Sequence, residues 1–197
     1  MGKLLIVGTV AFDAIETPFG KTEKILGGAA TYIGLSASYF NLDAALISVV
    51  GGDFPDEFIQ MLKEKEIDVS GIEIKKEGKT FFWSGRYDYN LNTRDTLVTD
   101  LNVLADFDPV VPENFTDCDF LMLGNLHPSV QMSVINQIPD RPKLVVLDTM
   151  NFWMDNTIDE LIEVIRKVDV ITINAVSYTH LTLPTMRLRC RSRWWRG

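Results

Sequence analysis

Short apolar runs alternate along this chain with segments of helical spacing, and this alternation limits the folds that it can adopt. The apolar runs cover residues 3–8, 44–50, 120–124, 143–148 and 170–174. Such near-continuous hydrophobic runs are typical of strands in a sheet that is covered on both faces. The helical segments cover residues 27–40, 53–65, 129–137 and 157–168. Strands that alternate with helices predict an α/β fold with a mostly parallel sheet flanked by helices.

Two segments interrupt this alternation. Residues 80–89 and 95–102 are rich in aromatic and β-branched side chains, and they flank residues 90–93, whose asparagines favour a turn. This pattern predicts a β-hairpin, to which residues 12–24 are expected to add a further extended segment. Two interpretations stay open: a small β lid over one edge of the main sheet, or an ordinary antiparallel extension of that sheet.

The composition restricts the class of protein. With 197 residues, of which 46% are hydrophobic, the chain is long enough for one sizeable core and is not of a disordered class. The net charge of −8 argues against binding nucleic acid by broad neutralisation of its backbone. Cys118 and Cys190 give neither a disulfide framework nor a metal-ligand spacing, and no apolar stretch is long enough to span a membrane. We therefore expect a cytoplasmic protein with no membrane partner, no nucleic-acid partner and no metal ligands of its own.

The end of the chain differs sharply from the rest. Residues 176–197 contain no acidic residue, five arginines and two adjacent tryptophans. A basic, aromatic tail of this kind would ordinarily suggest binding to nucleic acid or to a membrane surface. However, its first ten residues, VSYTHLTLPT, match the codon-by-codon translation of a sequencing adapter. We interpret residues 176–197 as an artefactual, non-native tail, and residues 1–175 as a domain whose carboxy-terminal part is missing.

Three short elements contain the residues best suited to binding chemistry. Asp13 follows the first strand, where open α/β sheets bind ligands, and its carboxylate can accept hydrogen bonds from two sugar hydroxyls; a loop Asp that solvates a turn is the alternative. Gly27 and Gly28 open a helix, where paired glycines allow a ligand to approach the backbone; close packing of helix on sheet is the alternative. Asp53 precedes the next helix and is expected to cap it.

In this order and spacing, these elements resemble the amino-terminal part of the ribokinase-like (PfkB) carbohydrate kinase family. The resemblance runs from residue 1 to about residue 174. It rests on Asp13, Gly27-Gly28, the stretch VVGGDFPDEFIQMLKEKEIDVSGI, the lid-like strands, Gly124-Asn125 and Asp148-Thr149-Met150-Asn151. The resemblance implies a ribokinase-like fold in which residues 12–24 and 80–102 form the lid. It also implies transfer of the γ-phosphoryl group of ATP to a hydroxyl of a small-molecule sugar or nucleoside, with Mg²⁺ arriving together with ATP.

The resemblance also assigns roles to residues near the acceptor. It implies that Asp13, Gly27 and Gly28 contact the acceptor beneath a lid that excludes water. Tyr32 stands where the family commonly has an Asn that holds a sugar hydroxyl, and this departure leaves the identity of the acceptor open. The lid is also expected to be the surface through which a homodimer forms.

Further contacts are expected from the lid and from the end of the last strand. The lid candidates for contact with the acceptor are Phe82, Trp83 and Arg86, although alternation in a strand turns only every second side chain inward. Asn174 is the candidate for binding the nucleotide, because the family has an Asn-x-x-Glu element near the phosphates that would begin there. In this chain Ser177 occupies the position of the Glu.

The family's second signature does not occur in this sequence. That element, of the type Asp-Thr-x-Gly-Ala-Gly-Asp, supplies the catalytic base and the anion hole of the family. We therefore expect an incomplete kinase without its own catalytic residues. An α/β module that binds a sugar, or dimerises through the β lid, without catalysis is the alternative. An oxidoreductase with a nucleotide cofactor is less well supported, because no glycine fingerprint follows the first strand.

Overall fold

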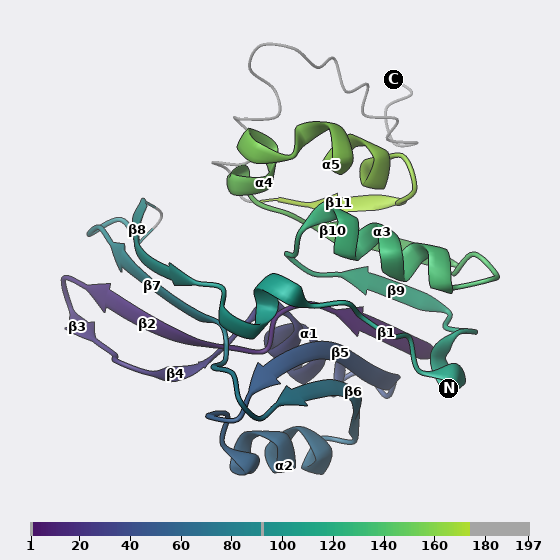
Figure 1. Cartoon of the computed structure of the whole chain (residues 1–197), viewed down its shortest axis with the longest axis horizontal. Helices are drawn as coiled ribbons and strands as arrows, with labels where there is room; N and C mark the ends of the chain where they lie inside the picture. The colour runs from purple at the N-terminus through teal and green to yellow at the C-terminus, as the bar shows by residue number, and fades with distance from the viewer. Residues whose placement is uncertain (1, 92, 174–197) are drawn as a thin grey trace.

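The computed structural model describes residues 2–91 and 93–173 and shows two β-sheets with helices packed around one of them (Figure 1). The strands are β1 (Lys3–Val7), β2 (Ala11–Thr17), β3 (Gly20–Lys21), β4 (Ile25–Gly27), β5 (Asp43–Gly51), β6 (Ile67–Lys75), β7 (Phe82–Tyr87), β8 (Arg94–Asp100), β9 (Phe120–Leu123), β10 (Leu144–Asp148) and β11 (Val170–Thr172). The α-helices are α1 (Ala29–Ala37), α2 (Asp56–Glu64), α3 (Pro128–Gln137), α4 (Asn151–Asn156) and α5 (Ile158–Ile165). Two short 3₁₀ helices, η1 (Asn102–Asp106) and η2 (Glu113–Phe115), lie between β8 and β9.

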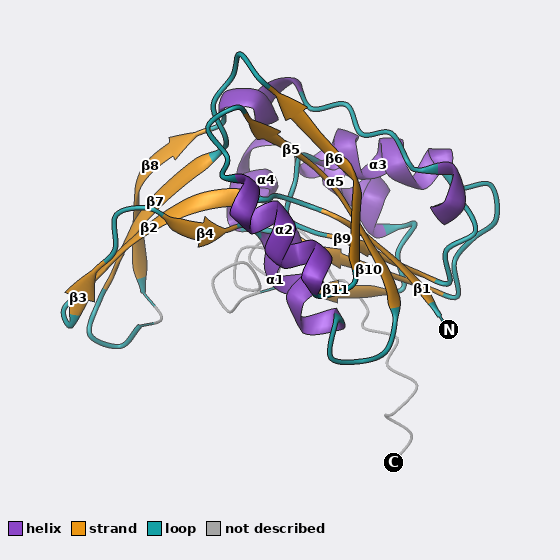
Figure 2. Ribbon diagram, turned by 90° about the horizontal axis from the view of Figure 1, so that it is seen from below, coloured by secondary structure: helices purple, strands orange, loops and turns teal. Residues whose placement is uncertain are grey.

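The main sheet has six strands in the order β11-β10-β9-β1-β5-β6, and each neighbouring pair is parallel. Alternate side chains of β1 enter two separate cores because successive residues of a strand point to opposite faces. Leu5 and Val7 pack with residues of α3 and α5, whereas Ile6 packs with residues of α1 and α2. Helices therefore cover both faces of the sheet (Figure 2), and the α/β prediction is confirmed.

The second sheet, here called the lid sheet, is formed by β2, β3, β4, β7 and β8 and projects from the carboxyl end of the main sheet (Figure 1). Strands β7 and β8 are antiparallel, which confirms the predicted hairpin. Strand β2 pairs with β7 in parallel, and β3 and β4 pair antiparallel with β2. The alternative prediction, an antiparallel extension of the main sheet, is wrong because no strand of the lid sheet pairs with a described strand of the main sheet.

Among the elements that were not expected from the sequence are β6 and α4. Strand β6 is the outer strand of the main sheet beside β5, and most of its side chains are only partly buried or exposed. It therefore lacks the continuous apolar run that marks the inner strands. Helix α4 has six residues, which is too short for a helical period to show in the sequence. Both departures concern elements with little apolar patterning of their own.

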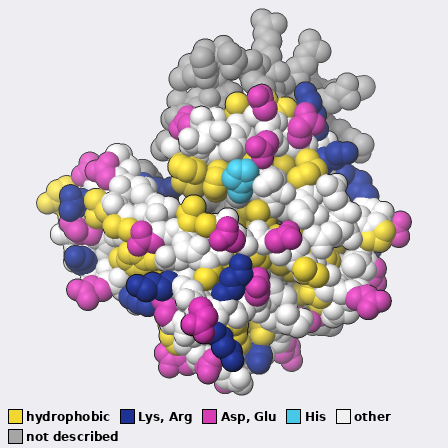
Figure 3. Space-filling model, in the orientation of Figure 1, with side chains coloured by type: hydrophobic (Ala, Val, Ile, Leu, Met, Phe, Trp, Pro, Cys, Tyr) yellow, Lys and Arg dark blue, Asp and Glu magenta, His cyan; other side chains and the backbone are white. Residues whose placement is uncertain are grey.

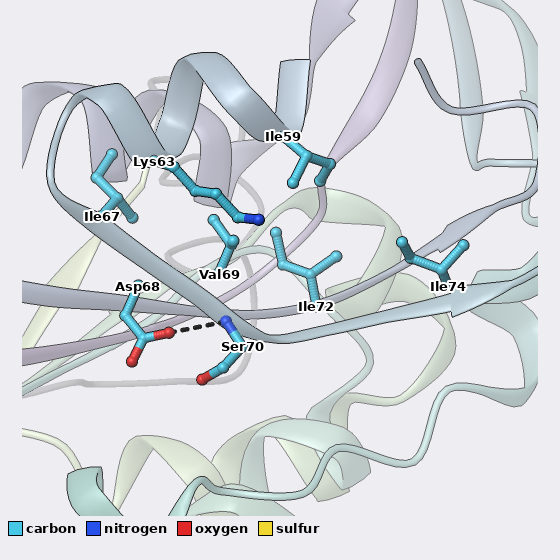
Figure 4. A pocket seen from close by; sticks show the side chains of 8 residues that line it. All are labelled: Ile59, Lys63, Ile67, Asp68, Val69, Ser70, Ile72 and Ile74. Atoms are coloured by element: carbon cyan, nitrogen blue, oxygen red, sulfur yellow. Dashed lines mark hydrogen bonds between the residues drawn. The ribbon is translucent and has the colours of Figure 1, made fainter. Parts of the chain in front are cut away.

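A groove lies along the outer edge of the main sheet, between α2 and β6 (Figure 4). It is lined by Ile59, Lys63, Ile67, Asp68, Val69, Ser70, Ile72 and Ile74. The carboxylate of Asp68 accepts a hydrogen bond of 2.8 Å from the backbone N–H of Ser70. No residue predicted to bind acceptor or nucleotide lines this groove, so it is separate from the predicted site.

The surface seen in Figure 3 carries acidic side chains interspersed with lysines and arginines. None of the described helices combines the length and the apolar character that a membrane crossing requires.

Candidate functional site

Asp13 lies inside a strand of the lid sheet. Strand β2 begins only four residues after the end of β1, so Asp13 leaves the carboxyl end of the main sheet as part of an extended segment. It pairs with Ile25 of β4 on one side and with Trp83 of β7 on the other. The alternative of a loop Asp is therefore wrong, and Asp13 stands at the root of the lid sheet.

Gly27 and Gly28 form the seat of the Asp13 carboxylate. A Cβ atom on Gly27 would overlap that carboxylate, so any side chain at this position would displace Asp13. Gly28 has a φ of +93°, a conformation that L side chains rarely adopt, and a Cβ there would also overlap the carbonyl of Thr9. The backbone N–H of Gly28 donates a hydrogen bond to Asp13. The space beside the paired glycines, which was expected to admit a ligand, is thus occupied by the Asp13 carboxylate.

The first N–H groups of α1 already have partners within the chain. The backbone N–H of Ala29 donates to Oγ1 of Thr9, and that of Ala30 donates to the carbonyl oxygen of Thr9, each at 3.0 Å. Helix α1 is therefore tied to the exit of β1 in the way that the close-packing alternative predicted. These two N–H groups are therefore not free to bind a ligand.

The environment of Asp13 combines burial with few internal partners. Burial raises the pKa of Asp13, while the N–H of Gly28 and the positive charge of Arg94 act in the opposite direction. Among the described residues, no side chain donates a hydrogen bond to this carboxylate. Its oxygens can therefore accept hydrogen bonds from hydroxyl groups of a bound molecule.

Tyr32 follows Gly28 on the first turn of α1, and its hydroxyl donates a hydrogen bond of 3.0 Å to the carbonyl oxygen of Leu26. The residue is 54% exposed. Because the phenol proton is already used, this oxygen can act toward a ligand only as an acceptor. An Asn amide at this position would offer both donors and an acceptor, so Tyr32 changes the chemistry available to an acceptor molecule.

The lid candidates lie on two different faces of the lid sheet. Trp83 is opposite Asp13 in the register of β2 and β7, so their side chains share a face. Phe82 lies on the other face, where it packs with Phe12 in the core against α1 and α2. Arg86 also lies there, and its Nε is 2.8 Å from a carboxylate oxygen of Glu16. The structure thus brings Trp83 to Asp13, and it does not bring Phe82 or Arg86 there.

Arg94 was not among the residues predicted from the sequence. It begins β8 and lies opposite Tyr87 of β7, two residues beyond Gly85 on the Trp83 face. Its guanidinium lies over the Trp83 ring, with Cζ 5.3 Å from the ring centroid. No motif marks this arginine, and only the pairing of β7 with β8 places it beside Asp13 and Trp83.

Asp53 does not cap α2, because the helix begins at Asp56 and Pro55 occupies the cap position. Its carboxylate instead accepts two hydrogen bonds of 2.7 Å, from the backbone N–H and from the hydroxyl of Thr80. The ammonium group of Lys24 lies 3.5 Å away. Burial alone would raise the pKa of Asp53, but the bonds from Thr80 and the charge of Lys24 hold it below its ordinary value. Asp53 therefore holds two segments that lead into the lid sheet, at Lys24 before β4 and at Thr80 before β7, close to the end of β5.

A second cluster of polar residues, apart from that around Asp13, lies at the ends of β9 and β10. Gln131 of α3 is fully buried, and its amide donates to the carbonyl oxygens of Gly124 at 2.8 Å and Asp148 at 3.3 Å. Burial raises the pKa of Asp148 to about 6, although the backbone N–H of Thr149 opposes this shift. Sequence reasoning missed Gln131, because a single polar residue on a helix gives no sign that it joins two strand ends.

The predicted nucleotide contact is not placed by the structure. Asn174 lies outside the described residues, as do residues 176–197. Within residues 2–91 and 93–173, no three or more His, Cys, Asp and Glu side chains gather in an arrangement able to hold a metal ion.

No family model matches this chain. The cytidine kinase of Thermococcus kodakarensis is 26% identical to it over 175 residues, which are 87% of this chain and 61% of that kinase. The nucleoside kinase of Methanocaldococcus jannaschii, described as an archaeal member of the ribokinase family, superposes with a TM-score of 0.72 at 18% identity, over 91% of this chain and 62% of that one. The Burkholderia thailandensis nucleoside kinase in complex with inosine gives a TM-score of 0.68 at 12% identity, over 88% and 61% of the two chains.

These similarities concern the fold. They show that the described residues have the α/β fold of ribokinase-like kinases, with a mostly parallel sheet and a small β lid, so the predicted fold and the resemblance to that family are confirmed. The chain spans about three-fifths of the length of these relatives.

Proposed function

We propose that this chain, which has the fold of the ribokinase-like kinases, contains the acceptor-binding part of an enzyme that transfers a phosphoryl group from ATP to a hydroxyl of a sugar or nucleoside. The observation that carries the proposal is the half-buried carboxylate of Asp13, seated on Gly27 and Gly28 at the root of the lid sheet. The names of the relatives, a cytidine kinase and two nucleoside kinases, support an activity of this class.

The geometry suits the recognition of neighbouring hydroxyl groups. A carboxylate has two oxygens and can accept a hydrogen bond from each of two hydroxyls on one sugar ring. The N–H of Gly28 orients the group, while Gly27 leaves space for it against the backbone. The lid sheet stands over the same edge and, in this proposal, excludes water when an acceptor binds, which favours transfer over hydrolysis of ATP.

The nucleotide half of the reaction is a separate proposal. ATP would supply the phosphoryl group, and Mg²⁺ would screen the charge of its phosphates. Among the described residues, no group of three or more His, Cys, Asp and Glu side chains is able to hold a metal ion, and the proposed contact of Asn174 lies outside these residues. A Gly-Ala-Gly-Asp element is absent from the printed sequence. We therefore propose that these 197 residues by themselves bind the acceptor without phosphorylating it, which makes an α/β sugar-binding module the second candidate.

Two properties of the protein in the cell remain part of the proposal. The sparse cysteines, without a disulfide spacing, favour the reducing cytoplasm. The antiparallel β7–β8 hairpin leaves β8 at the edge of the lid sheet with its side chains exposed, and this edge is the surface proposed for a homodimer.

Calorimetric titration of the chain with ribose and with ribonucleosides tests the role of Asp13. Asp13→Asn keeps the size of the side chain but removes its charge and one acceptor oxygen. Because hydrogen bonds to charged groups contribute about 1.5–3 kcal/mol, we expect the affinity to fall about 12- to 140-fold. Asp95→Asn is the matched control, since Asp95 is an exposed lid residue on the face of Arg86, and it should leave the affinity unchanged. Equal affinity of Asp13→Asn and the parent chain would refute the site.

The interpretation of the tail is tested on the source gene. Sequencing across the codon for Asn174 should show a reading frame that continues into a Gly-Ala-Gly-Asp element, and the protein from that frame should consume ATP with a sugar or nucleoside. A source gene that encodes VSYTHLTLPT and stops at Gly197 would contradict the kinase and leave the binding module.

A further inference from the structure

Trp83 is a large side chain of the lid sheet that belongs to neither core. It is partly exposed, and it is absent from both clusters of packed hydrophobic residues among the described residues, although its neighbour Phe82 packs against one of them. Its six-membered ring lies over Gly85, where a Cβ atom would overlap the ring. The strand therefore holds this indole ring against its own backbone rather than burying it.

Arg94 lies over the same ring. Its guanidinium Cζ is 5.3 Å from the ring centroid, which is within the range of a cation–π contact. Arg94 is exposed, and no carboxylate of a described residue forms a salt bridge with it, whereas Arg86 on the opposite face is paired with Glu16. The Trp83 ring, which lies against Gly85, and the Arg94 guanidinium beside it are here called the Trp83–Arg94 platform.

The platform lies on the face of Asp13. Residues that are directly opposite in neighbouring strands point to the same side, and the salt bridge between the register partners Glu16 and Arg86 illustrates this for β2 and β7. Asp13 and Trp83 are register partners in the same pair of strands. Arg94 is opposite Tyr87 in the register of β7 and β8, on the same face of β7 as Trp83, and its charge acts on the Asp13 carboxylate.

We propose that the Trp83–Arg94 platform makes the site selective for an acceptor that carries an aromatic base on its sugar, so that a nucleoside binds in preference to the free sugar. This inference rests on the proposed function. The sugar hydroxyls donate to Asp13, and the base stacks on the platform beside it. Aromatic rings and arginine guanidinium planes are the two surfaces on which proteins stack bases.

The preference for a nucleoside over its free sugar is the measure that tests this inference. It is the ratio of the dissociation constants of ribose and of a ribonucleoside, determined by calorimetry on the same chain with cytidine, uridine and adenosine. Since stacking of one base on an aromatic side chain is lost on substitution by alanine, Trp83→Ala should weaken nucleoside binding about 5- to 140-fold and leave ribose binding unchanged. Trp83→Phe, which keeps an aromatic ring, should restore a large part of the preference.

Arg94→Gln should lower the preference for a nucleoside over ribose more than the control Lys21→Gln does. The control removes a cation from the exposed strand β3. The inference is overturned if Trp83→Ala leaves the preference unchanged, or if it weakens ribose and nucleoside to the same degree. These results differ from a failure of the proposed function, in which the parent chain binds neither ribose nor any nucleoside and Asp13→Asn has no effect.

Discussion

Substitution of Gly27 by alanine should destabilise the protein specifically through Asp13. The added Cβ would fall on the Asp13 carboxyl group, and even the farthest of its three atoms, Oδ1, would be 2.8 Å away. Real Cβ atoms essentially never approach a heavy atom within 3.0 Å, so the Asp13 side chain must move. Because overpacking of this kind costs about 1–3 kcal/mol, we expect the free energy of unfolding to fall by about that amount.

A double-mutant cycle measured by urea unfolding tests the cause. In a chain that already carries Asp13→Ala, the clashing atoms are gone, and Gly27→Ala should cost less than about 0.5 kcal/mol. The coupling energy between the two positions should therefore account for most of the loss. Gly20→Ala is the control, because a Cβ on Gly20 meets nothing within 4 Å. Equal costs of Gly27→Ala in the two backgrounds would refute the reasoning, since the clash would then lie elsewhere.

Two further predictions concern carboxylates. Because the folded-state pKa of Asp148 is about 6 against an ordinary 3.8, ionisation of this group lowers the free energy of unfolding by up to about 3 kcal/mol as the pH rises from 4 to 7. In urea unfolding, the free energy of unfolding of Asp148→Asn should therefore decline less over this pH range than that of the parent chain. Parallel pH profiles of the two proteins would contradict this. Asp53→Ala leaves the buried hydroxyl of Thr80 without its acceptor, so it should lower the free energy of unfolding at pH 7 by about 1–3 kcal/mol. Since the pKa of Asp53 is depressed, the cost of the substitution should fade as the pH falls below about 4. A cost that persists at pH 2 would contradict this prediction.

The main sheet was predictable because its inner strands are buried on both faces. A strand such as β5, with eight of nine residues buried, must be apolar at almost every position, and this leaves a run that is visible in the sequence. Strand β6 lies at the edge of the same sheet and has only two buried residues, so the same rule did not find it. A strand that is buried on both faces was therefore predictable from the sequence, and a strand at the edge of the sheet was not.

The site was predictable in part. Asp13, Gly27 and Gly28 stand within 16 residues of one another in the sequence, and they meet because β4 pairs antiparallel with β2 after residues 18–24, which include β3. The role of Asp53 was predicted wrongly because its partner, Thr80, is 27 residues away and no local pattern connects them. The neighbouring sequence alone suggested that Asp53 caps a helix, whereas in the structure Asp53 binds Thr80 in a distant segment.

By itself, the sequence determined the alternation of strands and helices and the existence of the lid hairpin, and it singled out Asp13, Gly27 and Gly28, because each of these depends on local spacing or on apolar runs. Only the tertiary structure decided which lid residues share a face with Asp13. A shift of one residue in strand register moves every side chain to the opposite face, and the aromatic residues on both faces of β7 make the two registers alike in pattern. The pairing of β2, β7 and β8 therefore selected Trp83 and Arg94, and it turned Phe82 and Arg86 away.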